Sequence, residues 1–87
     1  MTDRLTRAVV DRLAELRDIA NVIKSVIAED AAGRVTFADL AGTIAPKLYR
    51  AASPALHRDI RQACRLLGLA TTTMHGGFRV VRGVRLR

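Results

Sequence analysis

The sequence predicts one small α+β domain that is mainly helical and ends in a β-hairpin. Residues 3–30 contain no glycine or proline and repeat apolar side chains at helical spacing. Ser53-Pro54 is a strong helix start, because serine caps the first amides and proline fits the first helical position. A His-Gly-Gly turn signal at 75–77 precedes a stretch in which apolar and basic residues alternate. With 87 residues, the chain has room for one hydrophobic core.

The amino-terminal segment is expected to form one long amphipathic helix, or two helices that break near residues 18–21. Its apolar side chains fall on a single stripe about 140° wide on a helical wheel, with charged residues on the other side. Gly33 is the expected stop of this helix, because glycine is common just after a helix end. A short β-like stretch is expected at residues 34–36.

Two shorter helices are expected next. Thr36, with an acidic residue three positions later, resembles a capping box that begins the second helix. Pro46 disfavours helical geometry in the residue before it, so the second helix kinks or ends there. The third helix is expected to begin after Ser53 and to end near residue 67, where Gly68 stops it.

The hairpin is expected to consist of a threonine-rich strand at residues 69–74, the turn and a second strand at 78–86. Side chains alternate across a strand, so one set of residues in the second strand is expected to point one way, namely Phe78, Val80, Val84 and Leu86. Arg79, Arg85 and Arg87 are expected to point the other way, and Arg82 breaks the pattern.

Composition excludes several classes of protein. The apolar runs are too short to cross a membrane, and we expect no secretory signal. A lone cysteine, Cys64, excludes a disulfide framework and fits a reducing, cytoplasmic compartment. With two histidines it does not make a zinc set, so we expect no metal and no cofactor. We also expect no enzymatic activity, because so short a chain offers little room for a substrate pocket.

Three residues have both a structural and a functional interpretation. Cys64 is expected to be a small buried hydrophobic residue rather than a redox sensor. Tyr49 is expected to pack against the core rather than to stack on a base. His75 is expected to sit at the hairpin tip, where it could touch phosphate.

Positive charge is concentrated in the second half of the chain. The formal net charge is +7, and residues 46–87 carry nine basic residues against one acidic residue. Residues 1–45 carry six basic and seven acidic residues. Solubility does not require such an asymmetry, so we expect a polyanionic partner.

The third helix separates an apolar face from a basic one. Arg58, Arg61 and Arg65 lie nearly opposite its apolar side chains. A helix fits the major groove of B-DNA, where arginine reads guanine and glutamine reads adenine, and arginine can also clamp phosphate. The residues expected to contact DNA from this helix are Ser53, Ala55, His57, Arg58, Arg61, Gln62 and Arg65.

The hairpin supplies a second basic element directly after this helix. A β-ribbon that carries arginines can enter a minor groove or brace the DNA backbone. The alternative interpretation is a basic surface that only keeps the domain soluble. The residues expected to contact DNA from the hairpin are Thr72, His75, Gly76, Gly77, Arg79, Arg82, Arg85 and Arg87.

The order of these elements resembles a winged helix-turn-helix domain. Residues 34–40, 53–69 and 74–86, with a Gly-Gly turn and an Arg-rich strand, resemble the C-terminal winged helix of phage, plasmid and poxvirus-type primase-helicases. The chain lacks a Walker phosphate loop and primase carboxylates, so the resemblance implies binding of double-stranded DNA only. It implies that the third helix is the recognition element and that the hairpin is the wing.

Three roles are compatible with this resemblance. The expected role is a small transcriptional regulator or an accessory protein of a phage, plasmid or other mobile element. One alternative is a replication module that binds origins, primers or forks beside a helicase or primase. The other is a protein-interaction winged helix whose basic face meets an acidic partner.

A winged helix would occupy residues 21–87, which leaves residues 1–20 as an added amphipathic helix for dimerisation or packing. This helix either folds back on its own core or pairs two chains. We expect a homodimer, because two-fold symmetry would match a pseudo-palindromic DNA site. The residues expected at the dimer interface are Leu5, Val9, Leu13 and Leu16.

Overall fold

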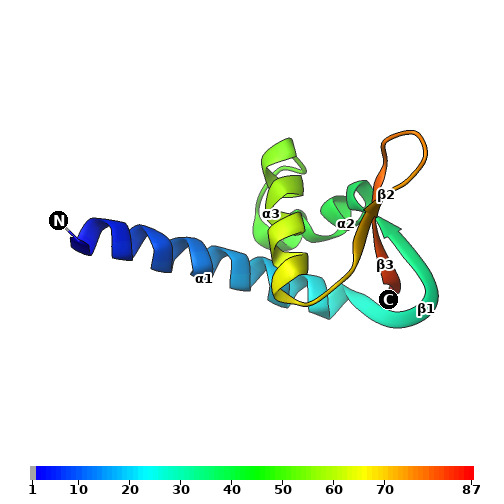
Figure 1. Ribbon diagram of the computed structural model, residues 1–87, viewed down its shortest axis with the longest axis horizontal. Helices are drawn as coiled ribbons and strands as arrows, with labels where there is room; N and C mark the ends of the chain where they lie inside the picture. Colours follow the sequence, from blue (N-terminus) through cyan, green and yellow to red (C-terminus); the bar gives the residue numbers. More distant parts are fainter. Residues whose placement is uncertain (1) are drawn as a thin grey trace.

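The computed structural model describes residues 2–87 and shows an α+β fold, as the sequence predicts (Figure 1). The elements are, in chain order, helix α1 (Thr2–Val26), strand β1 (Ile27–Thr36), helix α2 (Phe37–Ile44), the 3-10 turn η1 (Pro46–Leu48), helix α3 (Pro54–Leu66), strand β2 (Thr71–Thr73) and strand β3 (Arg79–Leu86).

The strands form one antiparallel sheet in the order β1-β3-β2. The carboxyl-terminal strand therefore lies in the middle, with Val81 paired to Val35 of β1 on one side and to Thr71 of β2 on the other. The register between β1 and β3 shifts between Glu29 and Arg34. The β2–β3 connection extends away from the helices as a loop (Figure 1).

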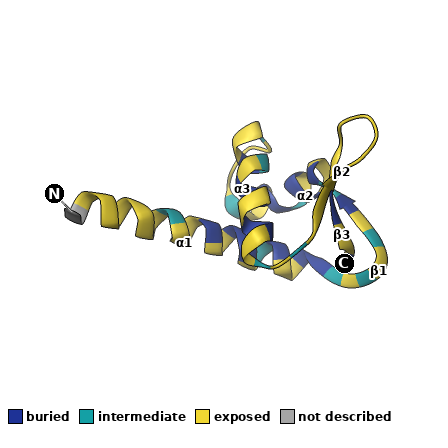
Figure 2. Cartoon of the chain, viewed as in Figure 1, coloured by how far each residue is buried: buried dark blue, intermediate teal, exposed yellow. Residues whose placement is uncertain are grey.

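The core lies between the three helices and the sheet face that carries Val35, Val81 and Val84. It is almost wholly aliphatic, and Phe37 is the one aromatic residue among its buried members in the described chain. The buried residues gather where the second half of α1 meets α2, α3 and the sheet, whereas the first half of α1 is exposed (Figure 2). The largest fully buried side chains are Ile23, Leu40, Ile44, Leu56, Ile60, Val81 and Cys64.

The first helix is unbroken and ends at Val26, so the expected end at Gly33 was wrong. The residues after Val26 join β1 because β3 offers their backbone groups partners, beginning with Ile27 opposite Leu86. Gly33 lies within β1, at the register shift, and a Cβ there would stand 2.3 Å from the carbonyl oxygen of Val84. Its role is to let two backbones approach closely.

The starts of α2 and α3 are confirmed. Thr36 Oγ1 accepts a hydrogen bond from the Asp39 amide at 3.0 Å, and Ser53 Oγ accepts one from the Leu56 amide at 3.3 Å. Helix α2 ends just before Pro46, where η1 begins. Gly68 follows α3 with a φ of +70°, the left-handed geometry typical of a helix stop.

The hairpin lies where the sequence predicts it, but the predicted alternation along β3 was partly wrong. Phe78 is 65% exposed, and Val80 is buried but lies outside the core cluster that contains Val81 and Val84. Gly83, with a φ of +79°, interrupts the alternation, so Val81 and Val84 both reach the core although they are three positions apart.

Tyr49 corrects a second expectation. It is 97% exposed rather than packed on the core. Its φ of +54° places it in the left-handed region at the end of η1, where the chain reverses toward α3. Tyr49 therefore takes part in the turn that ends η1 and not in the core.

Candidate nucleic-acid interface

Helix α3 packs through one face and presents arginines from the other. Leu56, Ile60 and Ala63 are completely buried, whereas the arginines at 58, 61 and 65 are exposed. Pro54 and the Ser53 cap fix where the helix begins, and burial of its apolar face leaves the arginines facing outward. The predicted separation of apolar and basic faces is therefore present.

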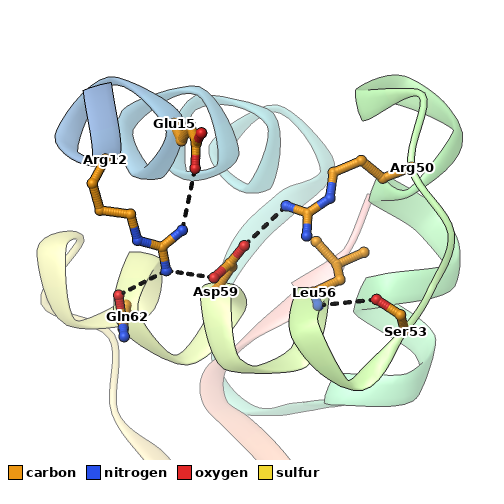
Figure 3. A network of polar contacts seen from close by, with 7 residues as sticks. All are labelled: Arg12, Glu15, Arg50, Ser53, Leu56, Asp59 and Gln62. Atoms are coloured by element: carbon orange, nitrogen blue, oxygen red, sulfur yellow. Dashed lines mark hydrogen bonds and ion pairs between the residues drawn. The ribbon is translucent and has the colours of Figure 1, made fainter. Parts of the chain in front are cut away.

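A charged network that the sequence did not reveal ties α3 to two other elements (Figure 3). Asp59 Oδ1 accepts a hydrogen bond from Arg12 Nη2 of α1 at 2.5 Å, and Oδ2 accepts one from Arg50 Nη1 at 2.9 Å. Burial alone would raise the pKa of the Asp59 carboxyl, but the bonds from Arg12 and Arg50 outweigh it and hold that pKa below its usual value.

This network changes the electrostatics of the basic half. Asp59 is the one acidic residue in positions 46–87. Because it is 7% exposed and shared by two guanidiniums, it offers almost no negative charge to the surface of α3. The sequence carries one signal of this arrangement: Asp59 directly precedes the core residue Ile60.

The predicted contact residues of α3 lie on two sides of the helix. Ala55, Arg58 and Gln62 line an open pocket of about 710 Å³ between α1, η1, the connection before α3 and α3 itself. Gln62 Oε1 accepts a hydrogen bond from Arg12 Nη2 at 3.2 Å, so its side chain is turned toward α1 (Figure 3). These three residues therefore belong to a separate, mixed-charge hollow.

Arg61 faces the hairpin instead. It lines a cleft of about 230 Å³ together with Arg79 of β3 and the three threonines of β2 (Thr71–Thr73). Within residues 4–87, no acidic residue lines this cleft and neither arginine forms an ion pair with a carboxylate. The structure thus brings together one predicted helix contact and two predicted hairpin contacts, Thr72 and Arg79.

His57 lies near the base of the hairpin turn. Its ring stands edge-on to Phe37, with centroids 6.4 Å apart. The two rings line a cavity of about 320 Å³ with Gly77, Phe78 and Arg79. Arg79 therefore borders both this cavity and the cleft beside Arg61. Gly76 and Gly77 have φ values of +93° and +84°, which explains why the turn uses glycines.

The other hairpin arginines are not brought to α3. Arg82 stands opposite Arg34 and Arg85 opposite Ala28 in the β1–β3 register. Because their neighbours Val81 and Val84 face the core, these two side chains project from the other face of the sheet. Arg87 Nε donates a hydrogen bond to the Ile27 carbonyl oxygen at 2.7 Å, which holds it beside the end of α1. The surface that α3 shares with the hairpin therefore contains fewer of the predicted hairpin contacts than expected.

Three of the four residues predicted for a dimer interface are exposed, and one is buried. Leu5, Val9 and Leu13 are exposed on α1. Leu16 is buried within its own chain, which leaves it little surface for a partner.

Cys64 is buried, as expected, and burial raises the pKa of its thiol to about 11. Within the part of the chain that the structure describes, no group of three metal-ligating side chains comes together, and no helix is long and apolar enough to cross a membrane. No family model matches the chain, and neither a curated protein nor a solved structure matches it.

Proposed function

We propose that this chain binds double-stranded DNA as a winged helix, with α3 as the recognition helix and the β2–β3 hairpin as the wing. The cleft between α3 and β2 carries the proposal. Arg61 and Arg79 reach it from two elements, the threonines of β2 add hydroxyl donors, and no carboxylate of the described residues lines it. Guanidinium and hydroxyl groups are the donors that hold DNA phosphates.

The topology supports the same proposal. The helices and strands follow the order helix, strand, two helices and two strands, and the last strand lies between the other two. That arrangement is the one expected for a winged helix, and it sets the hairpin beside α3 (Figure 1).

The electrostatics support binding driven largely by phosphate neutralisation. Arg58, Arg61 and Arg65 are exposed along α3, and Asp59 is already shared by two arginines. With about five to seven phosphate contacts, the logarithm of the binding constant plotted against the logarithm of salt concentration has a slope of about −5 to −6.

Fluorescence anisotropy with labelled duplex, single-stranded and forked DNA, titrated across salt, tests the proposal. Tight binding to closed duplex with a steep salt dependence is the expected result. Selection from a random duplex library then identifies the preferred site. Absence of DNA binding at low salt, together with salt-sensitive binding to an acidic protein, would overturn the proposal.

A second candidate function, binding at forks or single strands, is favoured by one observation. Phe78 is exposed beside His57 and Arg79, and an aromatic ring next to a guanidinium can stack on an unpaired base. Phe78→Leu should then weaken the binding of forked DNA by about 5- to 100-fold and leave the binding of closed duplex unchanged. Tyr49→Leu is the matched control, because Tyr49 is exposed on a different connection. Equal effects of Phe78→Leu on both DNAs would remove this candidate.

A further inference from the structure

The first half of α1 projects from the body of the molecule (Figures 1 and 2). Residues 4–11 are all exposed. They include Leu5 and Val9, which are 74% and 58% exposed, and Leu13 follows at 44%. These three large apolar side chains are four positions apart, so they form one row along the helix.

This row continues the stripe with which α1 packs its own core. Leu16 and Ile19 come next on the same side of the helix, and both are buried. An isolated helix of this length has marginal stability in water, because only a few turns of hydrogen bonds offset the unfavourable free energy of nucleation. The projecting half therefore needs a second surface to remain helical.

We propose that the row is the contact between two copies of this chain, which pack their α1 helices antiparallel about a two-fold axis at Val9. A two-fold contact requires a patch that is complementary to itself. The spacing of the row meets this requirement, because the rotation places Leu5 of one copy against Leu13 of the other and brings Val9 against its own counterpart. Rows with a spacing of four pack into one another at a crossing angle of about −50°.

The charges favour a second copy over a charged partner. Arg7, Asp11 and Asp18 lie on the side of α1 opposite the row, so self-pairing brings no like charges of these residues together. The row itself offers no basic surface for an acidic partner.

The charges also favour the antiparallel arrangement. Residues 46–87 carry nine basic residues and one acidic residue. An antiparallel pair places these two basic bodies at opposite ends of the helix pair, whereas a parallel pair would set them side by side, where they would repel each other.

Light scattering on Val9→Glu and Val10→Glu tests the proposal with a matched pair. The two valines are adjacent and similarly exposed, at 58% and 56%, but Val10 points about 100° away around the helix. The wild-type chain is expected to have twice the monomer mass of 9.5 kDa. Val9→Glu should raise the dimer dissociation constant at least about 100-fold, because the axis buries two carboxylates side by side. Val10→Glu should remain dimeric.

Cysteine cross-linking gives the orientation without depending on a destabilising charge. Under mild oxidation Val9→Cys should form a covalent dimer, because the axis brings the two thiols together, and Val10→Cys should not. When the two variants are mixed, Leu5→Cys chains should form disulfides with Leu13→Cys chains. Each variant alone should form few covalent dimers. Cys64 is buried and does not interfere.

Two results would overturn the proposal. One is a wild-type chain that is monomeric at micromolar concentration while circular dichroism shows α1 to be helical. The other is a dimer that Val9→Glu leaves intact. Cross-linking of Leu5→Cys to itself would replace the antiparallel arrangement with a parallel one. None of these measurements uses DNA, so their outcome is independent of the proposed DNA binding.

Discussion

Asp59 accepts a hydrogen bond from Arg12 at 2.5 Å, although the two residues lie 47 positions apart in the sequence. Arg50 takes the other carboxylate oxygen, so one side chain of α3 joins α1 to the connection before α3. Glu15 also accepts from Arg12, at 3.3 Å, and holds that guanidinium from the α1 side. The network therefore ties α3 to α1 and to the connection before α3.

Asp59→Asn should lower the free energy of unfolding at neutral pH by about 1–3 kcal/mol. The substitution replaces a buried carboxylate by a weaker acceptor between two guanidiniums. The decrease in the free energy of unfolding is no larger than this because Arg12 and Arg50 are both partly exposed, so water screens their charges. Urea unfolding followed by circular dichroism measures it, with the exposed Asp18→Asn as control.

The same pair predicts a dependence on pH. The pKa of Asp59 is lowered in the folded state, so its stabilising contribution is complete above the unfolded pKa of about 4. It is lost as pH falls through the lower folded value. The stability difference between wild type and Asp59→Asn should therefore shrink on acidification below about pH 4. A difference that stays constant into that range would contradict the role of the ion pair.

Two glycines should respond to alanine in opposite directions. Gly33→Ala should cost about 1–3 kcal/mol, because its Cβ would overlap the Val84 carbonyl oxygen at the register shift between β1 and β3. Gly42→Ala should stabilise by about 0.5–1 kcal/mol, because Gly42 lies within α2 with nothing within 4 Å of an added Cβ. Thermal unfolding of both variants measures these changes in stability. An unchanged stability of Gly33→Ala would show that the backbones of β1 and β3 can move apart at this position.

Arg79→Gln should weaken duplex binding more than Arg85→Gln does. Both residues are in β3, but Arg79 lines the cleft beside Arg61, whereas Arg85 projects from the other face of the sheet. If Arg79 holds one phosphate, its loss makes the salt slope shallower by about 1. Arg61→Ala should relax the sequence preference if Arg61 reads a base edge, and should weaken the binding of all duplexes alike if it holds a phosphate beside Arg79. Equal losses for Arg79→Gln and Arg85→Gln at every salt concentration would argue against the cleft.

Cys64 should react with a thiol reagent only when the chain unfolds. The side chain is completely buried, and burial raises the pKa of its thiol to about 11, so thiolate is scarce near neutral pH. Labelling with a chromogenic disulfide should follow the unfolding rate as urea is added. The exposed Val10→Cys provides a thiol that should label at once. Prompt labelling of wild-type chain would mean that α3 opens locally.

The sequence predicts the helices of this protein well because their ends are encoded locally. Thr36 and Ser53 cap the helices that they precede, and Gly68 stops α3, each through contacts within a few residues. The end of α1 is different. Residues 27–30 continue the helical pattern, but β3, which lies more than fifty positions later, pairs with them as a strand. A tertiary contact of this kind is not visible in a local pattern.

The candidate site was predictable by residue type and less so by arrangement. The arginine face of α3 follows from helical periodicity alone. The division of the hairpin arginines between two sheet faces depends on Gly83 and on the register with β1, and the inward turn of Gln62 depends on Arg12. These positions are set by contacts between segments that lie far apart in the sequence.

The projecting half of α1 also affects how the molecule moves through solution. The chain measures 48 × 24 × 23 Å, with a radius of gyration of 13.8 Å. A compact chain of this length would have a radius of gyration of about 12 Å. Such a shape raises the frictional coefficient, so a single chain elutes from a gel-filtration column ahead of a spherical standard of equal mass. Elution volume alone would therefore report too large a mass, which is why scattering or sedimentation must decide whether one copy or two are present.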